Sequence, residues 1–124
     1  MTKTAAIYNF FHSFGLPAWE ENSVPSGENE AELPYITYEV ITDADFHVVQ
    51  LNASVWYRSS SWVECNAKTD EISAYVGHGR VLACDGGALI FRKGTPFAQT
   101  LGLESDSMVK RKILAFEITF VTTY

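Results

Sequence analysis

Ten residues from Val49 to Arg58 alternate in character, and the fold of this chain has to accommodate them as a strand. One row is apolar and consists of Val49, Leu51, Ala53, Val55 and Tyr57, and the other consists of Gln50, Asn52, Ser54, Trp56 and Arg58. Because side chains alternate between the two faces of a strand, the period predicts one row on the core and one toward water or a partner. Trp56 lies on the second row, where it is expected to cover the sheet or to take part in a contact.

Further strands are predicted on both sides of this one. Residues Tyr35–Ile41 are rich in β-branched and aromatic side chains, and Thr42–Asp45 supplies a turn before a run that begins at Phe46. Two apolar runs, 80–84 and 88–92, flank Asp85-Gly86-Gly87, which is a hairpin signature. The chain is expected to close with a long strand, 108–122, that carries Leu114, Phe116, Ile118 and Phe120 on one row.

A helix is predicted near the start of the chain. Its apolar residues are Ile7, Phe10, Phe11 and Phe14, spaced as one face of a helix requires. Thr2 or Thr4 is expected to cap its first turn, and Gly15 followed by Pro17 to end it.

A second helix is predicted after the three serines 59–61. Its inward stripe is formed by Trp62, Cys65, Thr69, Ile72 and Val76, and glycines at 77 and 79 end it. Ser61 and Glu64 match the S-x-x-E capping box, in which each side chain bonds the backbone N–H of the other residue. Glu64 and Lys68 are expected to form an i,i+4 ion pair on the outer face.

The predicted order is therefore α-β-β-α-β-β-β, without the alternation of single strands and helices that marks a parallel sheet. It indicates an α+β fold, a mainly antiparallel sheet with two helices packed on one face. At 124 residues the chain is expected to form a single domain, 1–124. Residues 16–34 are expected to be a long acidic loop anchored by Trp19.

The net charge of −6 is unevenly distributed. Residues 1–50 carry one lysine against eight acidic residues, whereas residues 88–124 carry five basic residues against three acidic ones. This asymmetry would let one copy meet the next head to tail, although solvated faces that keep a protein soluble look the same. No basic stripe offers the phosphate contacts of a sequence-specific nucleic-acid binder.

No catalytic, cofactor-binding or metal-binding constellation is evident. The serines lack the glycines of a nucleophile elbow, and Cys65 lies on the inward stripe of a helix, where a thiol is buried. Cys84 is interpreted the same way, as a small buried side chain. The three histidines lie on separate elements, and Gly77-His78-Gly79-Arg80 lacks the dinucleotide-binding pattern. Asp43 and Asp45 are interpreted as part of a turn.

No apolar run approaches the roughly 20 residues that a membrane span needs, and the first residues do not resemble a signal peptide. A soluble protein made in the cytoplasm, with no membrane partner, is expected.

The run WYRSSSWVECNAKTDEI, the run DGGALIFRKGTPFAQ and a closing strand after DSMVKRK together resemble the tail-terminator, or tail-completion, proteins of long-tailed bacteriophages and prophages. The likeness extends from FFHSFGLPAWEENSVP through LPYITYEV to the C-terminal strand. It implies the α+β fold that the element order also predicts, and it brings no catalytic residues and no cofactor.

The resemblance implies a structural function in the virion. Members of this family form a ring, commonly a hexamer, at the head-proximal end of the finished tail tube. The implied partners are other copies of the chain, the tail tube protein and a head-completion or connector protein. DNA would pass through the ring without sequence-specific binding, and the protein would be made in the cytoplasm of a bacterial host.

Three interface hypotheses follow. In the first, a basic group of one copy faces acidic residues of the adjacent copy. The members of this group are Arg92, Lys93, Lys110, Arg111 and Lys112. A contact loop, 94–101, would present Phe97, Gln99 and Leu101, unless it folds back and buries Phe97 in its own core. Acidic residues lining the DNA channel would be Glu20, Glu21, Glu28, Glu30 and Glu32.

Three alternatives remain open on the sequence alone. The chain would be another joining protein of the virion, such as a head-completion or neck component, which differs only in its partner. It would be a small cytosolic binding module with no phage role. An enzyme using Cys65 or the serines is the third class.

Overall fold

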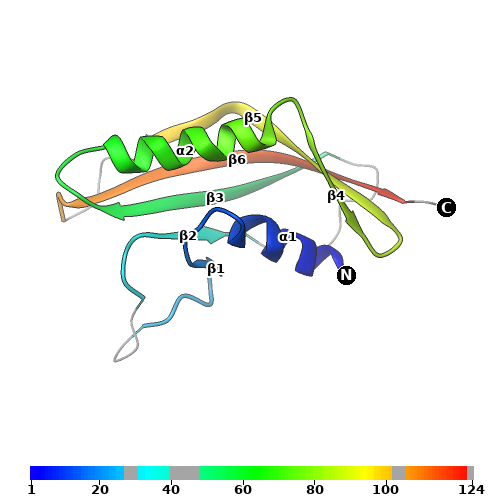
Figure 1. The fold of residues 1–124 in the computed structure, drawn as a ribbon, viewed down its shortest axis with the longest axis horizontal. Helices are drawn as coiled ribbons and strands as arrows, with labels where there is room; N and C mark the ends of the chain where they lie inside the picture. Colours follow the sequence, from blue (N-terminus) through cyan, green and yellow to red (C-terminus); the bar gives the residue numbers. More distant parts are fainter. Residues whose placement is uncertain (27–30, 40–47, 102–105, 123–124) are drawn as a thin grey trace.

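The computed structural model describes residues 1–26, 31–39, 48–101 and 106–122. Within these ranges two helices and six strands follow one another (Figure 1). They are α1 (Lys3–His12), β1 (Ala18–Glu20), β2 (Tyr35–Tyr38), β3 (Val49–Arg58), α2 (Val63–Val76), β4 (Arg80–Cys84), β5 (Gly87–Leu101) and β6 (Val109–Thr122). The strands form one sheet in the order β1-β2-β3-β6-β5-β4.

The fold is α+β, as predicted, but the sheet is mixed and has one more strand than expected. β1 pairs with β2 in parallel, and the other four pairings are antiparallel. The N–H of Ile36 donates to Pro17 O at 2.9 Å, and the N–H of Glu21 donates to Tyr38 O at 2.9 Å. The prediction of a continuous loop over 16–34 was wrong, because β1 lies within it. A strand of three residues is too short to show a period in the sequence. The predicted turn and strand start at 42–46 lie outside the described residues.

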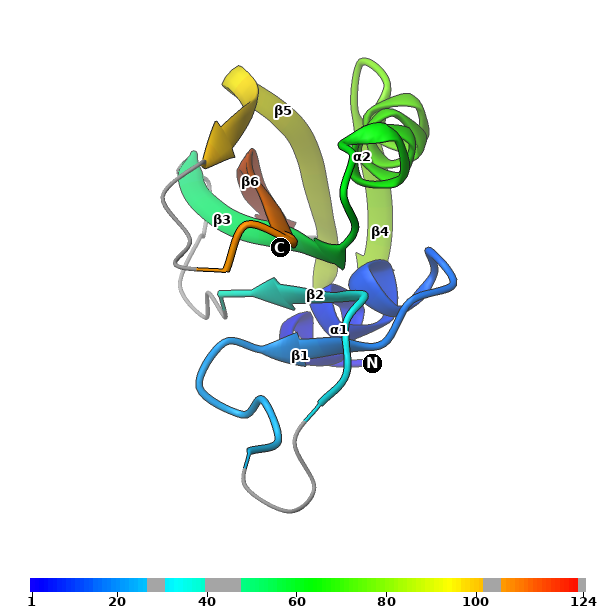
Figure 2. The same cartoon turned by 90° about the vertical axis from the view of Figure 1, so that its left-hand side faces the viewer.

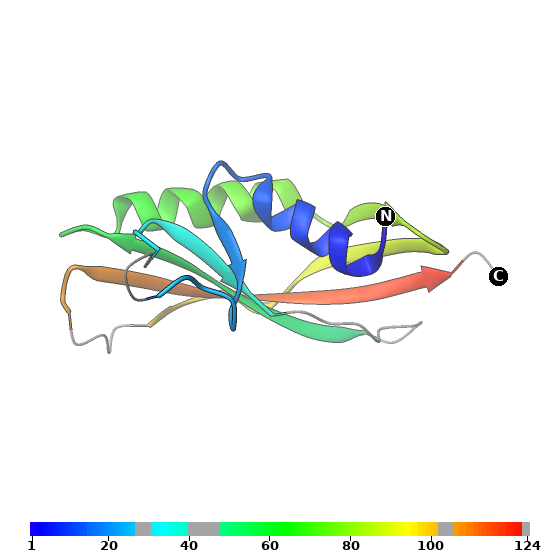
Figure 3. The same ribbon diagram turned by 90° about the horizontal axis from the view of Figure 1, so that it is seen from below.

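Both helices cover the same face of the sheet (Figures 2 and 3). The core between them is aromatic, with Phe10, Phe11, Phe91 and Phe116 all nearly inaccessible to solvent. The predicted apolar rows of β3 and β6 face this core, and Leu51, Val55 and Leu114 are completely buried. The second row of β3 therefore lies on the opposite face, which neither of the two described helices covers.

Helix α1 has the predicted cap and the predicted buried face. Thr2 Oγ1 accepts a hydrogen bond from the N–H of Ala5 at 3.1 Å. The N-terminus lies beside the edge strand β4, where the N–H of Asp85 donates to Met1 O and the terminal ammonium meets the Asp85 carboxylate, both at 2.6 Å. Together α1 and the N-terminus shield an edge that would otherwise be open to pairing with another strand.

The capping box predicted at the start of α2 does not form. The helix begins at Val63, its N-cap residue is Trp62, and no side chain caps it. Instead Ser61 Oγ accepts from the N–H of Val63, and Ser59 Oγ accepts from the N–H of Ser61, each at 3.1 Å. Serine hydroxyls that bond two residues ahead form consecutive turns, and these turns delay the helix by one residue past the predicted cap. Of the predicted stripe, Cys65, Thr69, Ile72 and Val76 are buried, whereas Trp62 precedes the helix and is only partly buried.

Strand β5 continues through the segment that was predicted to be a contact loop. The two-residue turn Asp85-Gly86 leads into it, as the hairpin signature predicted, with Gly86 at a φ of 81°. Pairing with β6 is interrupted between Lys93 and Ala98, and it then resumes as far as Leu101. This β-bulge absorbs Gly94-Thr95-Pro96, the turn-like residues that favoured a loop in the sequence.

Candidate interface on the open face of the sheet

The sheet face opposite the helices, which we call the open face, carries the second row of β3 and its neighbours on β6 and β5. Register places Trp56 opposite Arg111, Ser54 opposite Ile113, and Asn52 opposite Ala115. On β5 the matching residue beside Ile113 is Gln99. Because directly opposed residues share a face, all of these side chains project away from the helices.

Aromatic rings and a guanidinium form one end of the open face. Trp19 meets Tyr35 edge to face at 5.5 Å between centroids, and Tyr35 lies 6.2 Å from Trp56. The Arg111 guanidinium carbon lies 4.3 Å from the Trp56 ring centroid. Such half-buried tryptophan, tyrosine and arginine side chains are the residue types that dominate binding energy at protein interfaces.

Hydrogen bonds to buried hydroxyls hold this end in place. Trp56 Nε1 donates to Thr37 Oγ1 at 2.9 Å, and Arg111 Nε donates to Ser54 Oγ at 3.0 Å. Ser54 is only 4% exposed although it lies on the open face, because the ring and the guanidinium cover it. The cluster is therefore preorganised, which lowers the entropy cost of any contact it makes.

The basic group predicted at Lys110, Arg111 and Lys112 is divided between the two faces. These residues are consecutive in a strand, so Arg111 points to the open face and its neighbours point to the helix side. Lys110 Nζ lies 5.7 Å from the Trp62 ring centroid and donates to the carbonyl of Ser107. Lys112 lies near Cys65. These three residues therefore do not form the single basic group that the sequence suggested.

Arg92 and Lys93 are separated in the same way. Lys93 Nζ donates to Ser73 Oγ of α2 at 3.1 Å, on the helix side. Arg92 is on the open face, opposite Glu117 of β6, and its side chain lies against Gly79. Of the five predicted basic residues, the structure places Arg92 and Arg111 on the open face.

The predicted contact residues of 94–101 also divide. Phe97 packs inward, edge to face with Phe116 at 5.4 Å, so the alternative in which it folds back onto its own core holds. Gln99 and Leu101 stay on the open face, with Leu101 opposite Arg111.

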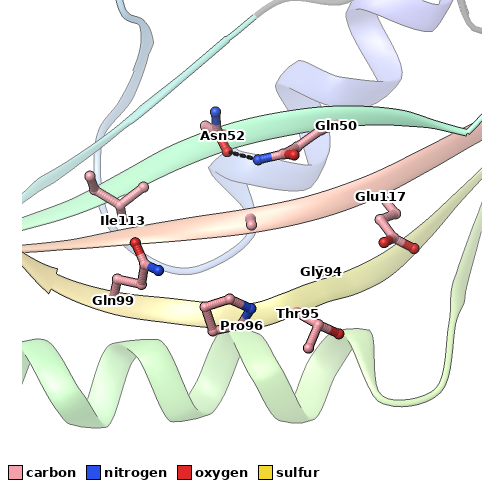
Figure 4. Close-up of a pocket in the computed structure, with 9 residues that line it drawn as sticks. Gln50, Asn52, Gly94, Thr95, Pro96, Gln99, Ile113 and Glu117 are labelled. Atoms are coloured by element: carbon pink, nitrogen blue, oxygen red, sulfur yellow. Dashed lines mark hydrogen bonds between the residues drawn. The ribbon is translucent and has the colours of Figure 1, made fainter.

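The bulge in β5 creates a hollow on the open face with a volume of about 180 Å³ (Figure 4). Its lining consists of Gln50, Asn52, Gly94, Thr95, Pro96, Gln99, Ile113, Ala115 and Glu117. Gly94 lies so close to β6 that a Cβ there would be 3.0 Å from the Ala115 Cβ. Gln50, Asn52 and Glu117 were missed as site residues, because the pairing of β3 with β6 brings them together and the irregularity in β5 after Lys93 forms the depression beside them.

Of the predicted channel residues, Glu20 lies on the edge strand β1 of the sheet. Glu20 is the last residue of β1, and its carboxylate accepts from the backbone and side-chain amides of Asn22 and from the hydroxyl of Ser23. Glu21 and Glu32 are exposed. Glu28 and Glu30 lie outside the described residues.

The thiol of Cys65 has a structural environment. It is fully buried and donates weakly to Val55 O at 3.6 Å. Burial raises the pKa of this thiol, and the nearby Lys112 only partly opposes the rise. A protonated, inaccessible thiol is a poor nucleophile.

We expect a thiol reagent to modify Cys84 and to leave Cys65 unmodified while the protein is folded. Cys84 is partly exposed, whereas Cys65 becomes reachable only when α2 leaves the sheet. Counting modified thiols by mass spectrometry, with and without denaturant, measures this difference. Cys84→Ser is the matched control and should abolish labelling of the folded protein. Rapid modification of Cys65 in that variant would contradict the packing and favour the enzyme alternative.

Among the described residues, no group of three or more His, Cys, Asp or Glu side chains is arranged to hold a metal ion. In the same ranges no helix has both the length and the apolar character needed to cross a membrane.

No family model matches the sequence, and no curated protein matches it significantly. Among solved structures, the fold is similar to a chain from the "Virion of native gene transfer agent (GTA) particle", with a TM-score of 0.67 and 14% sequence identity. The alignment covers 96% of this chain and 94% of that chain. At this identity the likeness establishes a shared fold, and it extends over nearly the full length of both chains.

Proposed function

We propose that this chain is a structural protein of a phage-like virion, and specifically the tail terminator that closes the head-proximal end of the tail tube. The observation that carries the proposal is the fold likeness, over 96% of the chain, to a chain of a gene transfer agent virion. The resemblance of the sequence to tail-terminator proteins points the same way. The role needs binding surfaces and no chemistry, in keeping with the buried Cys65.

In this role several copies, six by family resemblance, form a ring that stops polymerisation of the tube and receives the head. A ring requires two different surfaces of the chain to match each other. The acidic residues Glu20, Glu21 and Glu32 at the β1 end would repel phosphates and let DNA pass, if that end lines the channel. The structure offers the open face as a further surface for a partner.

A head-completion or neck protein is the second candidate, because it would share the fold likeness to a virion chain. The two candidates differ in position and in consequence. Without a terminator the tube has no stop signal, whereas without a neck protein tails of the correct length fail to hold their heads.

Localisation tests the proposal. Particles would be produced with this chain carrying a C-terminal histidine tag and labelled with nickel-coated gold. Negative-stain electron microscopy should place the gold at the junction of head and tail, and particles with the untagged chain should remain unlabelled. Gold at the distal tip or over the capsid would reject the terminator, and tagged particles without the protein would reject any virion role.

A further inference from the structure

On the open face, strand β6 carries a hydrogen-bond donor, Arg111, and an acceptor, Glu117. Arg111 and Glu117 are six residues apart in β6, so both side chains project from the open face about 20 Å apart at roughly 3.4 Å per residue. Ile113 and Ala115 lie between them. A surface with a cation at one end, an anion at the other and an apolar centre is complementary to a second copy of itself.

We propose that two copies of the chain pair through their open faces about a two-fold axis that passes close to Leu114 of β6. In this arrangement Arg111 of each copy lies against Glu117 of the other. Ile113 and Ala115 of one copy then meet Ala115 and Ile113 of the other across the axis.

The donor side is available for this contact. Arg111 uses Nε to reach Ser54 and the face of its guanidinium to cover Trp56. In the part of the chain that the structure describes, its two terminal nitrogens have no hydrogen-bond acceptor. Because a guanidinium presents donors in a rigid fork, these two nitrogens suit a carboxylate in a bidentate arrangement.

The acceptor side is the hollow formed by the bulge in β5. Glu117 stands exposed at one end of the hollow, the carboxamides of Gln50 and Asn52 lie along its β3 side, and Gln99 lies at the opposite end (Figure 4). Gln50 Nε2 donates to Asn52 Oδ1 at 2.9 Å, which leaves the carbonyl oxygen of Gln50 as an acceptor. Arg92 is the nearest cation in register, but its side chain lies against Gly79, and no ion pair between it and Glu117 occurs in the described ranges.

The size of the hollow favours a side chain over a small molecule. Pockets that bind metabolites or drugs have volumes of about 300–1,000 Å³. The hollow measures about 180 Å³, which is too small for such a ligand and large enough for the end of an arginine.

The symmetry follows from the placement of the two charges. A head-to-tail ring needs its complementary patches on different faces, whereas donor and acceptor in this chain share one face. Face-to-face packing of two sheets is a common arrangement, with an interlayer distance of about 10 Å. The pair is therefore distinct from a ring contact and does not depend on the tail-terminator role. The pairing of two copies would bury the open face until another partner binds there.

Charge exchange tests the pairing. Wild type, Arg111→Glu and Glu117→Arg would be examined by sedimentation velocity, separately and as an equimolar mixture. We expect a dimer for wild type, and for each variant alone an association weaker by about tenfold in Kd or more. The mixture should recover the dimer, because both contacts between the two variants are again between opposite charges. The double variant Arg111→Glu/Glu117→Arg should recover it as well.

Controls separate charge from folding. Lys110→Glu and Asp70→Arg make the same changes of net charge away from the open face and should leave the dimer unchanged. Glu117→Arg changes an exposed residue that makes no side-chain hydrogen bond in the described ranges, so it tests the pairing even if Arg111→Glu does not fold. A wild-type monomer at about 1 mM, a larger closed assembly, or dimers that persist in Glu117→Arg would each overturn the proposal.

Discussion

Replacing Phe11 with alanine is expected to lower the free energy of unfolding by about 3–5 kcal/mol, as truncation of a fully buried aromatic ring does. Phe11 is 0% exposed and connects α1 to three strands. It stacks on Tyr38 of β2 at 4.7 Å and contacts Phe116 of β6 and Phe91 of β5 at 5.6 and 6.5 Å between centroids. Removing the ring leaves a cavity that a sheet on one side and a helix on the other cannot close.

Urea unfolding followed by tryptophan fluorescence measures this loss, with Tyr8→Ala as the control on the same helix. Tyr8 is 50% exposed, and the contact it loses is a stack on His12 at the surface. We expect this control to change stability by less than about 1 kcal/mol. Similar losses in the two variants would show that α1 does not dock on the sheet as described.

Lys68→Met is expected to cost about 1.5–3 kcal/mol, because it removes a charged hydrogen bond from a largely covered site. Lys68 Nζ donates to the carbonyl of Phe14 at 2.7 Å, just after α1, and its side chain is only 16% exposed. The bond joins α2 to the segment that follows α1, on the sheet face that both helices cover. Without it the Phe14 carbonyl loses its partner, and methionine preserves most of the aliphatic packing.

Glu71→Gln separates the ion pair from the helix–helix bond. Lys68 also pairs with Glu71 at 3.0 Å, but that carboxylate is half exposed, so its loss should cost no more than about 1 kcal/mol. Thermal unfolding at low and high salt should show that salt screens most of the loss in Glu71→Gln, whereas most of the loss in Lys68→Met remains at high salt. If Glu71→Gln is as damaging as Lys68→Met, the loss comes from the ion pair within α2 and not from the bond to Phe14.

Local periodicity was sufficient for most of the fold. The faces of both helices, the long strands β3 and β6 and the hairpin at Asp85-Gly86 all follow from the spacing of apolar residues and one turn signature. Long elements carry many repeats of their pattern. β1 consists only of Ala18, Trp19 and Glu20, and it is a strand because it pairs in parallel with β2. The local sequence contains no pattern that predicts this pairing.

Hydrogen-bond choices were harder to foresee. Ser61 and Glu64 satisfy the capping box, yet the hydroxyl bonds Val63 two residues on, because Ser59 and Ser61 already form turns. Lys68 was expected to pair with Glu64, but it pairs with Glu71 of the same helix and, because α1 is docked beside α2, also with the Phe14 carbonyl. The partner of such a side chain depends on its tertiary neighbours, which the spacing of residues in the sequence does not reveal.

The candidate interface illustrates the same limit. The sequence places Lys110, Arg111 and Lys112 together, whereas a strand must send Arg111 to one face and its neighbours to the other. Conversely, Gln99 and Glu117 are far apart in the sequence, and a register shift across Gly94-Thr95-Pro96 brings both to one hollow. The alternation of side chains along a strand therefore predicts which residues share a surface better than the local density of charged residues does.

Tail length is the most direct test of the terminator proposal. In cells that produce tailed particles, this gene would be disrupted and the lengths of the tails measured by electron microscopy, with a wild-type copy supplied in trans as the control. We predict tails of irregular, extended length without attached heads, and normal particles after complementation. Tails of normal length that lack heads would favour the neck protein instead, and tails of normal length joined to heads would contradict a role in tail completion.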